Sequence, residues 1–126
     1  MSVNVLGELE CFSFPEPRRN ILVPAGQEKI VWEEPMSGGF KGFIDRISAT
    51  RGDNNLGNNN TWIDLIVDGV RIERIKREIS LNLPDKINPP YVVEHKVTFR
   101  AHNGDTVAHQ FEVVCQGRLC RPKTIS

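Results

Sequence analysis

The sequence predicts an all-β fold, an antiparallel two-sheet sandwich of jelly-roll or immunoglobulin-like topology. The main evidence is a period-two alternation of apolar and polar side chains between residues 91 and 115, interrupted at Asn103-Gly104. Turn residues elsewhere divide the chain into roughly seven to nine short strands, and no long helix is indicated. Because 126 residues are enough to enclose one core, we expect residues 1–126 to form a single β-sandwich domain. A small closed barrel is the alternative.

The first half of the chain contains the signals for four strands. They are expected at residues 3–12, 28–33, 40–50 and 61–68. In the first strand, Gly7 weakens the strand or marks a bulge, and Pro15 and Pro17 should end it. Pro24-Ala25-Gly26 predicts a turn before the second strand. Residues 52–60 are polar and rich in asparagine, so we expect an exposed loop there.

Asp68-Gly69 is the dipeptide of a type I′ hairpin turn. Such a turn would pair Val67 with Val70 and Leu65 with Ile72, and would place all four side chains on one face. The opposite face would then carry a surplus of apolar side chains.

Beyond Ile72 the apolar residues change from even to odd positions. A slip of this kind indicates a bulge or a change of sheet near Glu73-Arg74. We expect the strand to continue through Leu81 and Leu83, because they prolong the alternation. The alternative is a helix, since Ile72, Ile75 and Ile79 also fit helical spacing.

We expect residues 91–115 to form one hairpin whose register depends on the turn. A loop that places Gly104 in the left-handed region would set Val97 opposite His109. A loop one residue later would set Lys96 opposite Glu112, which is the better charge match. The sequence leaves this choice open.

Composition excludes several functional classes. The 16 Lys and Arg residues balance the 16 Asp and Glu residues, so nucleic acid is not an expected partner. No apolar run approaches the roughly 18 residues of a membrane span, and the first residues lack the pattern of a signal peptide. We therefore expect a cytoplasmic protein without a membrane span. No nucleophile elbow or phosphate-binding loop is present, so we expect neither enzymatic activity nor a cofactor.

The three cysteines are too few for a disulfide scaffold. A tight hairpin between Cys115 and Cys120 would bring these two near enough to bridge. We expect two reduced thiols instead, with the bridge as the alternative.

His95, His102 and His109 recur every seven residues, which raises the question of a metal site. His95 and His109 should lie on the apolar face, and they are the candidate metal ligands. No carboxylate or cysteine clearly joins them, so we expect packed histidines and no bound metal.

The expected functional surface is an interface made by Trp62, Ile66 and Ile75, the apolar side chains opposite the filled face of the 61–83 segment. We expect the protein to work by self-association or by binding another protein. Arg71, Arg74, Lys76 and Arg77 form the densest basic patch, interpreted as a solvated face. Its alternative is an anion site where Trp62 stacks on a base or sugar. The second functional hypothesis is a module that binds sugar or metal through the asparagine-rich loop and exposed aromatic residues.

Two resemblances add to this interpretation. Residues 97–111 resemble the hairpin that supplies a first copper histidine in cupredoxin-like domains, here His109, although no histidine or methionine follows it to complete such a ligand set. In general character, the chain resembles small uncharacterised proteins of spherical viruses of crenarchaea. That resemblance implies a structural or accessory viral protein, located in the host cell or the virion.

Overall fold

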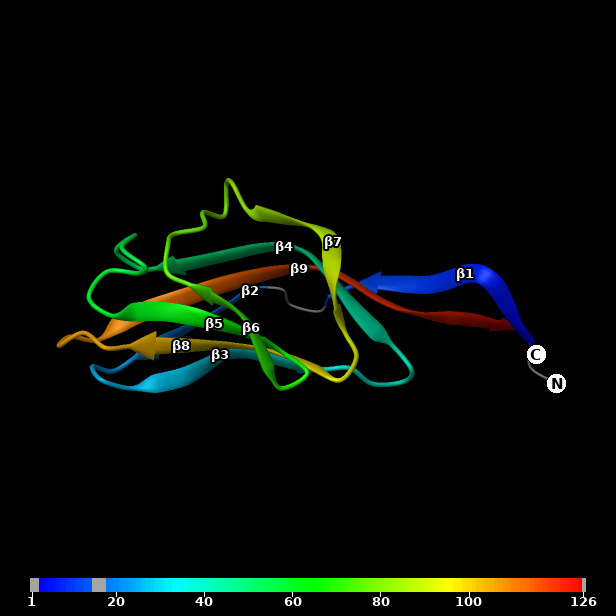
Figure 1. Cartoon of the computed structure of the whole chain (residues 1–126), viewed down its shortest axis with the longest axis horizontal. Coiled ribbons are helices and arrows are strands. Elements are labelled where there is room, and N and C mark those ends of the chain that lie inside the picture. Colours follow the sequence, from blue (N-terminus) through cyan, green and yellow to red (C-terminus); the bar gives the residue numbers. More distant parts are fainter. Residues whose placement is uncertain (1–2, 15–17, 126) are drawn as a thin grey trace.

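The computed structural model describes residues 3–14 and 18–125 and shows an all-β protein (Figure 1). The described residues contain nine strands and no helix. The strands are β1 (Val3–Ser13), β2 (Arg18–Val23), β3 (Glu28–Pro35), β4 (Lys41–Arg51), β5 (Thr61–Val67), β6 (Val70–Ile75), β7 (Asp85–Val93), β8 (Lys96–Asn103) and β9 (His109–Ile125). Pro15 and Pro17, predicted to end the first strand, lie outside the described residues.

The strands form two antiparallel sheets that enclose one core, as predicted for a sandwich. The five-stranded sheet has the order β1-β9-β4-β7, and β2 also pairs with β9 on the side away from β4. The four-stranded sheet has the order β3-β8-β5-β6. Alternate residues of both sheets point inward and are almost fully buried; the largest of them are Phe99, Phe111, Ile44, Ile47, Ile63 and Leu65.

The prediction of one hairpin over residues 91–115 is wrong. β8 lies in the four-stranded sheet and β9 in the five-stranded sheet, so the two face each other across the core. Val97 pairs with Glu34 and Val67, whereas His109 pairs with Val23, and neither predicted register exists. The period-two pattern reports which side of a strand is buried. Two strands facing one core from opposite sheets therefore give the same pattern as a hairpin.

The segment after Asp68-Gly69 confirms part of the prediction. Val67 pairs with Val70, but a bulge between Leu65 and Ile66 leaves Ile72 without a direct partner and pairs Leu65 with Glu73. This bulge accounts for the shift of apolar residues from even to odd positions after Ile72. Leu65 and Val67 are buried whereas Val70 and Ile72 are exposed, so the predicted shared face of these four side chains is wrong. The predicted continuation of the strand to Leu83 is wrong.

β6 ends at Ile75, after which the chain crosses to the other sheet. There Ile79 makes an isolated bridge with Ala49 of β4. Leu81 and Leu83 are exposed, and the helical alternative is wrong as well.

The asparagine-rich loop is mostly exposed, as predicted, but it has a buried anchor. Leu56 lies in the core and the Arg51 side chain is 3% exposed. The Arg51 guanidinium donates to both carboxylate oxygens of Asp53, while the Glu78 carboxylate accepts the backbone N–H groups of Arg51 and Leu56 at 2.9 and 2.8 Å. The polar groups of this loop are therefore largely used to hold the loop itself.

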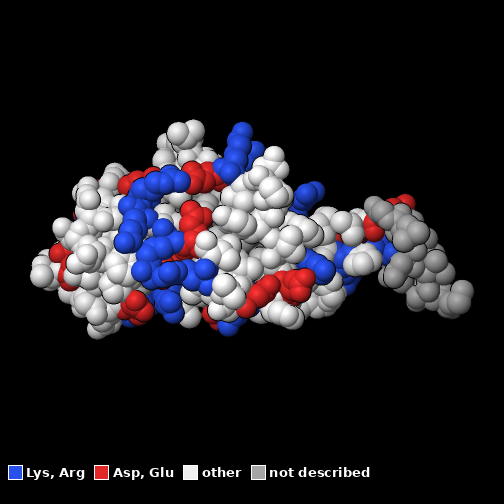
Figure 2. Space-filling model, in the orientation of Figure 1, with Lys and Arg blue, Asp and Glu red and all other residues white. Residues whose placement is uncertain are grey.

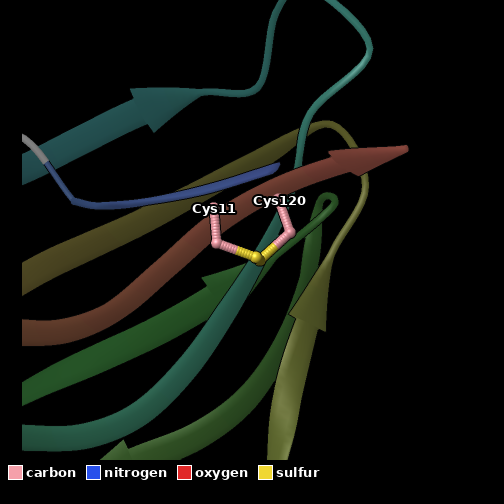
Figure 3. The surroundings of a disulfide bond; sticks show 2 residues. All are labelled: Cys11 and Cys120. Atoms are coloured by element: carbon pink, nitrogen blue, oxygen red, sulfur yellow. A yellow bond between two sulfur atoms is a disulfide. The ribbon is translucent and has the colours of Figure 1, made fainter. Parts of the chain in front are cut away.

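The Cys115–Cys120 bridge is wrong, and the expectation of two reduced thiols holds only for Cys115, because Cys11 and Cys120 form the disulfide (Figure 3). Cys11 of β1 lies directly opposite Cys120 of β9, with a Cα–Cα distance of 4.2 Å. Cys115 lies on the same strand as Cys120, five residues away, which separates the two by roughly 17 Å in extended chain. Cys115 remains a buried free thiol.

Candidate binding face on the four-stranded sheet

The outer face of the four-stranded sheet carries a set of charged and aromatic side chains in cross-strand rows. Odd residues of β5 and β8 fill the core, so the even residues point outward. The strand registers define three rows across the sheet, two of which extend from β3 to β6 and one from β3 to β5. These rows are Glu28, His102 and Trp62; Ile30, Arg100, Asp64 and Arg74; and Glu33, Thr98, Ile66 and Arg71.

Trp62 is covered on both faces of its indole ring. On the β8 side, His102 stacks on it with the ring centroids 3.9 Å apart and the planes 10° from parallel. On the β6 side, the Arg74 guanidinium lies 4.5 Å and the Lys76 ammonium 5.2 Å from the ring centroid. Such cations are attracted to the negative face of the ring. Trp62 therefore has no free ring face on which a base or a sugar could stack.

Asp64 is the buried charge at the centre of this face, with a side chain 2% exposed. Arg74 donates to its two oxygens at 2.9 and 3.2 Å, and Arg100 lies 3.8 Å away. A buried carboxylate needs such partners, because an unpaired charge out of water is costly. Asp64 thus fixes the two arginine side chains on the surface of the sheet.

A groove of about 330 Å³ runs beside this cluster. Ile30 and Ile66 supply its apolar surface, and Arg71, Lys96 and Arg100 supply positive charge. Ile30 is 48% exposed. The one carboxylate that lines the groove, Glu33, accepts a hydrogen bond from Thr98 at 3.0 Å and lies 3.7 Å from Lys96.

Positive charge predominates on this face although the whole chain is neutral. Figure 2 shows Lys and Arg side chains gathered over β5, β6 and β8 around a few carboxylates. Five cations, namely Arg71, Arg74, Lys76, Lys96 and Arg100, accompany three carboxylates, namely Glu28, Glu33 and Asp64. Within the described part of the chain, Arg71 and Lys76 have no carboxylate partner, so their charges are available to a ligand.

The structure separates the three residues of the predicted interface. Ile66 lines the groove, and Trp62 lies beside it under its covering cations. Ile75 is 2% exposed and pairs with Ile63 inside the core, so its predicted place on the outer face is wrong. The bulge at Ile72 reverses the parity of β6 and turns Ile75 inward.

Ile30, Arg100 and His102 belong to the same face but were not identified from the sequence. Each is an outward-facing residue of a predicted strand, yet nothing local shows that β3 and β8 lie next to β5. The position of each residue within its own strand shows that its side chain points outward. The sequence does not show the order of the strands, so it does not show that the three residues share one face.

The two candidate metal ligands lie at opposite ends of β8. His95 is exposed just before Lys96, whereas His109 begins β9, beyond the loop that follows Asn103. The His109 Nε2 lies 2.7 Å from the Asp105 carboxylate and its Nδ1 lies 3.9 Å from Asp53. The described residues contain no group of three or more side chains suited to a metal ion. His95 and His109 therefore do not form a shared site.

Comparison of this chain with protein families, curated proteins and solved structures found no match. Within the described residues, no helix is long and apolar enough to cross a membrane.

Proposed function

We propose that this is a non-enzymatic binding protein that docks another protein on the outer face of its four-stranded sheet. The observation that carries this proposal is the groove with Ile30 and Ile66 on its surface and Arg71, Lys96 and Arg100 around it. Accessible apolar side chains beside three cations, of which Arg71 has no carboxylate partner among the described residues, suit a partner segment that carries both apolar and acidic side chains.

The covered state of Trp62 supports a protein partner over nucleic acid. Binding of single strands without sequence preference relies on bases stacking on open aromatic faces. Here His102 occupies one side of the indole, and Arg74 and Lys76 occupy the other. The same geometry disfavours stacking of a sugar on Trp62, which was part of the anion-site alternative.

A labelled synthetic peptide of alternating glutamate and leucine tests the proposal, with binding followed by fluorescence anisotropy. We expect Arg71→Glu and Ile66→Thr each to weaken binding about tenfold, which corresponds to roughly 1.4 kcal/mol. Lys86→Glu is the matched control, because Lys86 is an exposed lysine on β7. Equal losses in all three variants, or binding of an oligothymidine probe in place of the peptide, would overturn the proposal.

We further propose that the sandwich is a jelly roll. Strands β2 to β9 form sheets in the orders β2-β9-β4-β7 and β3-β8-β5-β6, which is the interleaving expected when two Greek keys wind together. Viral capsid proteins, lectins and cupins use jelly rolls, so this topology is compatible with a viral structural or accessory protein.

The Cys11–Cys120 disulfide is compatible with the same setting. Disulfides are rare inside mesophilic cells, but intracellular proteins of hyperthermophilic archaea are often rich in them, and virion surfaces also retain them. We therefore propose the cytoplasm of a hyperthermophilic host, or the virion, as the location. Detection of the protein in purified virions by mass spectrometry would distinguish the two.

A further inference from the structure

The first and last strands form a two-stranded ribbon that projects beyond the body of the sandwich (Figure 1). β4 pairs with β9 only as far as Lys41 opposite Cys120. Beyond Cys120, the residues of β9 pair with β1 alone. The disulfide to Cys11 therefore closes the ribbon at the point where it leaves the sheet (Figure 3).

Between Leu9 and Ser13, the β1 edge of this ribbon has weaker protection against pairing than the edges formed by β3, β6 and β7. Native edge strands are blunted by prolines, bulges or short length. β7 contains Pro89 and Pro90, and β6 has six residues and a bulge. β3 has a register shift between Ile30 and Trp32 and ends at Pro35.

β1 also has a register shift, between Asn4 and Leu9, but from Leu9 to Ser13 it pairs with β9 in regular register and contains no proline. Leu9 is 57% exposed and Phe12 is 53% exposed on this segment. An isolated two-stranded ribbon is marginally stable in water, and a third strand would stabilise it. The open β1 edge is thus suited to pairing with another chain.

The charges of the ribbon indicate which chain this is. β1 carries Glu8 and Glu10, and β9 carries Arg121 and Lys123. Within the ribbon, Glu10 lies 2.8 Å from Arg121 and Glu8 lies 3.9 Å from Lys123. One edge strand is therefore acidic and the other is basic.

We infer that the ribbon joins copies of this chain head to tail, with β1 of one copy beside residues 121–125 of β9 of the next, where Pro122 removes one backbone donor. This arrangement continues the alternation of acidic and basic strands, so each Arg121 gains a second carboxylate neighbour. A two-fold contact between two β1 strands would bring acidic strands together and is disfavoured. A head-to-tail interface generates a ring or an open array. It uses a surface separate from the groove and does not depend on the proposed function.

A charge-swapped variant tests this inference. Glu8→Lys, Glu10→Lys, Arg121→Glu and Lys123→Glu in one chain keep both pairs inside the ribbon but exchange the signs of its strands. Light scattering should show that the wild type and the swapped variant each self-associate. Native mass spectrometry of wild type mixed with isotope-labelled swapped protein should show sorted assemblies, because wild-type β1 then has no basic β9 in the variant.

Three outcomes would overturn the inference. The first is a wild type that stays monomeric at high concentration. The second is free mixing of the wild type and the swapped variant in the same assemblies. The third is a preference for mixed assemblies, which pairing of β1 with β1 requires. If the swapped variant does not fold, the half-swapped pair provides the test. Neither Glu8→Lys/Glu10→Lys nor Arg121→Glu/Lys123→Glu should assemble alone, and their mixture should assemble. Failure of the mixture, with Lys86→Glu behaving like wild type, would count against the ribbon.

Discussion

The Asn103 side chain donates a 2.9 Å hydrogen bond to the backbone carbonyl of Val23, which ties β8 of one sheet to β2 of the other. Its amide also donates to the Val107 carbonyl at 2.9 Å, and its oxygen accepts the N–H of Asp105 at 3.0 Å. Asn103 is fully buried. This one side chain therefore holds the connection through which the chain passes between the sheets.

Replacing Asn103 with alanine should destabilise the protein by about 2–3 kcal/mol, because buried backbone groups lose their partners. Urea denaturation measures this change. Asn82→Ala is the control, since Asn82 is exposed. A loss no larger than that of the control would show that the connection is held by other contacts.

Asp68 should be a second position of high sensitivity. Its carboxylate accepts the backbone N–H groups of Glu94, His95 and Lys96 at 3.0, 2.6 and 3.0 Å. Burial alone would raise the pKa of Asp68, but these N–H groups outweigh it and lower the pKa. We expect Asp68→Ala to cost about 1–3 kcal/mol, measured by urea denaturation at neutral pH.

Asp68→Asn separates the two roles of this residue. Asp68 also occupies the left-handed region with φ of 52°, which asparagine tolerates. The Asn variant should therefore lose less stability than the Ala variant. Equal losses would assign the whole effect to the carboxylate.

Acid should weaken the contact between Asp105 and His109. The hydrogen bond from His109 is the main cause that lowers the pKa of Asp105 to about 2. A carboxyl whose folded pKa lies below its unfolded value of 3.8 stabilises the fold above pH 3.8, and this contribution is lost as the pH falls to about 2. NMR titration of the Asp105 carboxyl should give a midpoint near 2, and in His109→Phe a midpoint closer to 3.8. An unchanged midpoint in the variant would contradict the assignment.

Thiol labelling should count the cysteines in three steps. In the native protein no thiol should react, because burial raises the pKa of Cys115 far above its usual range and hides its sulfur. Denaturation should expose one thiol, and denaturation with a reductant should expose three. Three thiols without a reductant would exclude the Cys11–Cys120 disulfide.

Removal of that disulfide should reduce stability. The bond closes a loop of 109 residues in sequence, and loops of this size gain about 2–5 kcal/mol from a crosslink. Urea denaturation of Cys11→Ser/Cys120→Ser against the oxidised wild type measures the loss. Cys115→Ala, which leaves the disulfide intact, serves as the comparison for a simple cysteine replacement.

The strands themselves were largely predictable from local patterns. The alternation around Phe99 and Phe111 identified two strands that each bury one face, and Asp68-Gly69 identified a turn whose pairing of Val67 with Val70 is correct. The parity change after Ile72 correctly signalled an irregularity. These features depend on the conformation of a few neighbouring residues, which the sequence specifies directly.

The neighbours of each strand were decided by the tertiary structure. The strands of Phe99 and Phe111 show the same apolar alternation whether they pair in one sheet or face each other across a core. The residues around Asn103 therefore do not show that the chain passes from one sheet to the other there. The stacking of His102 on Trp62 and the bond between Cys11 and Cys120 likewise join residues that are distant in sequence. The sequence by itself determined the position of most strands and the buried face of β5, β8 and β9, but not the buried face of β6. Only long-range packing decided which strands lie side by side, and hence the groove, the disulfide and the ribbon.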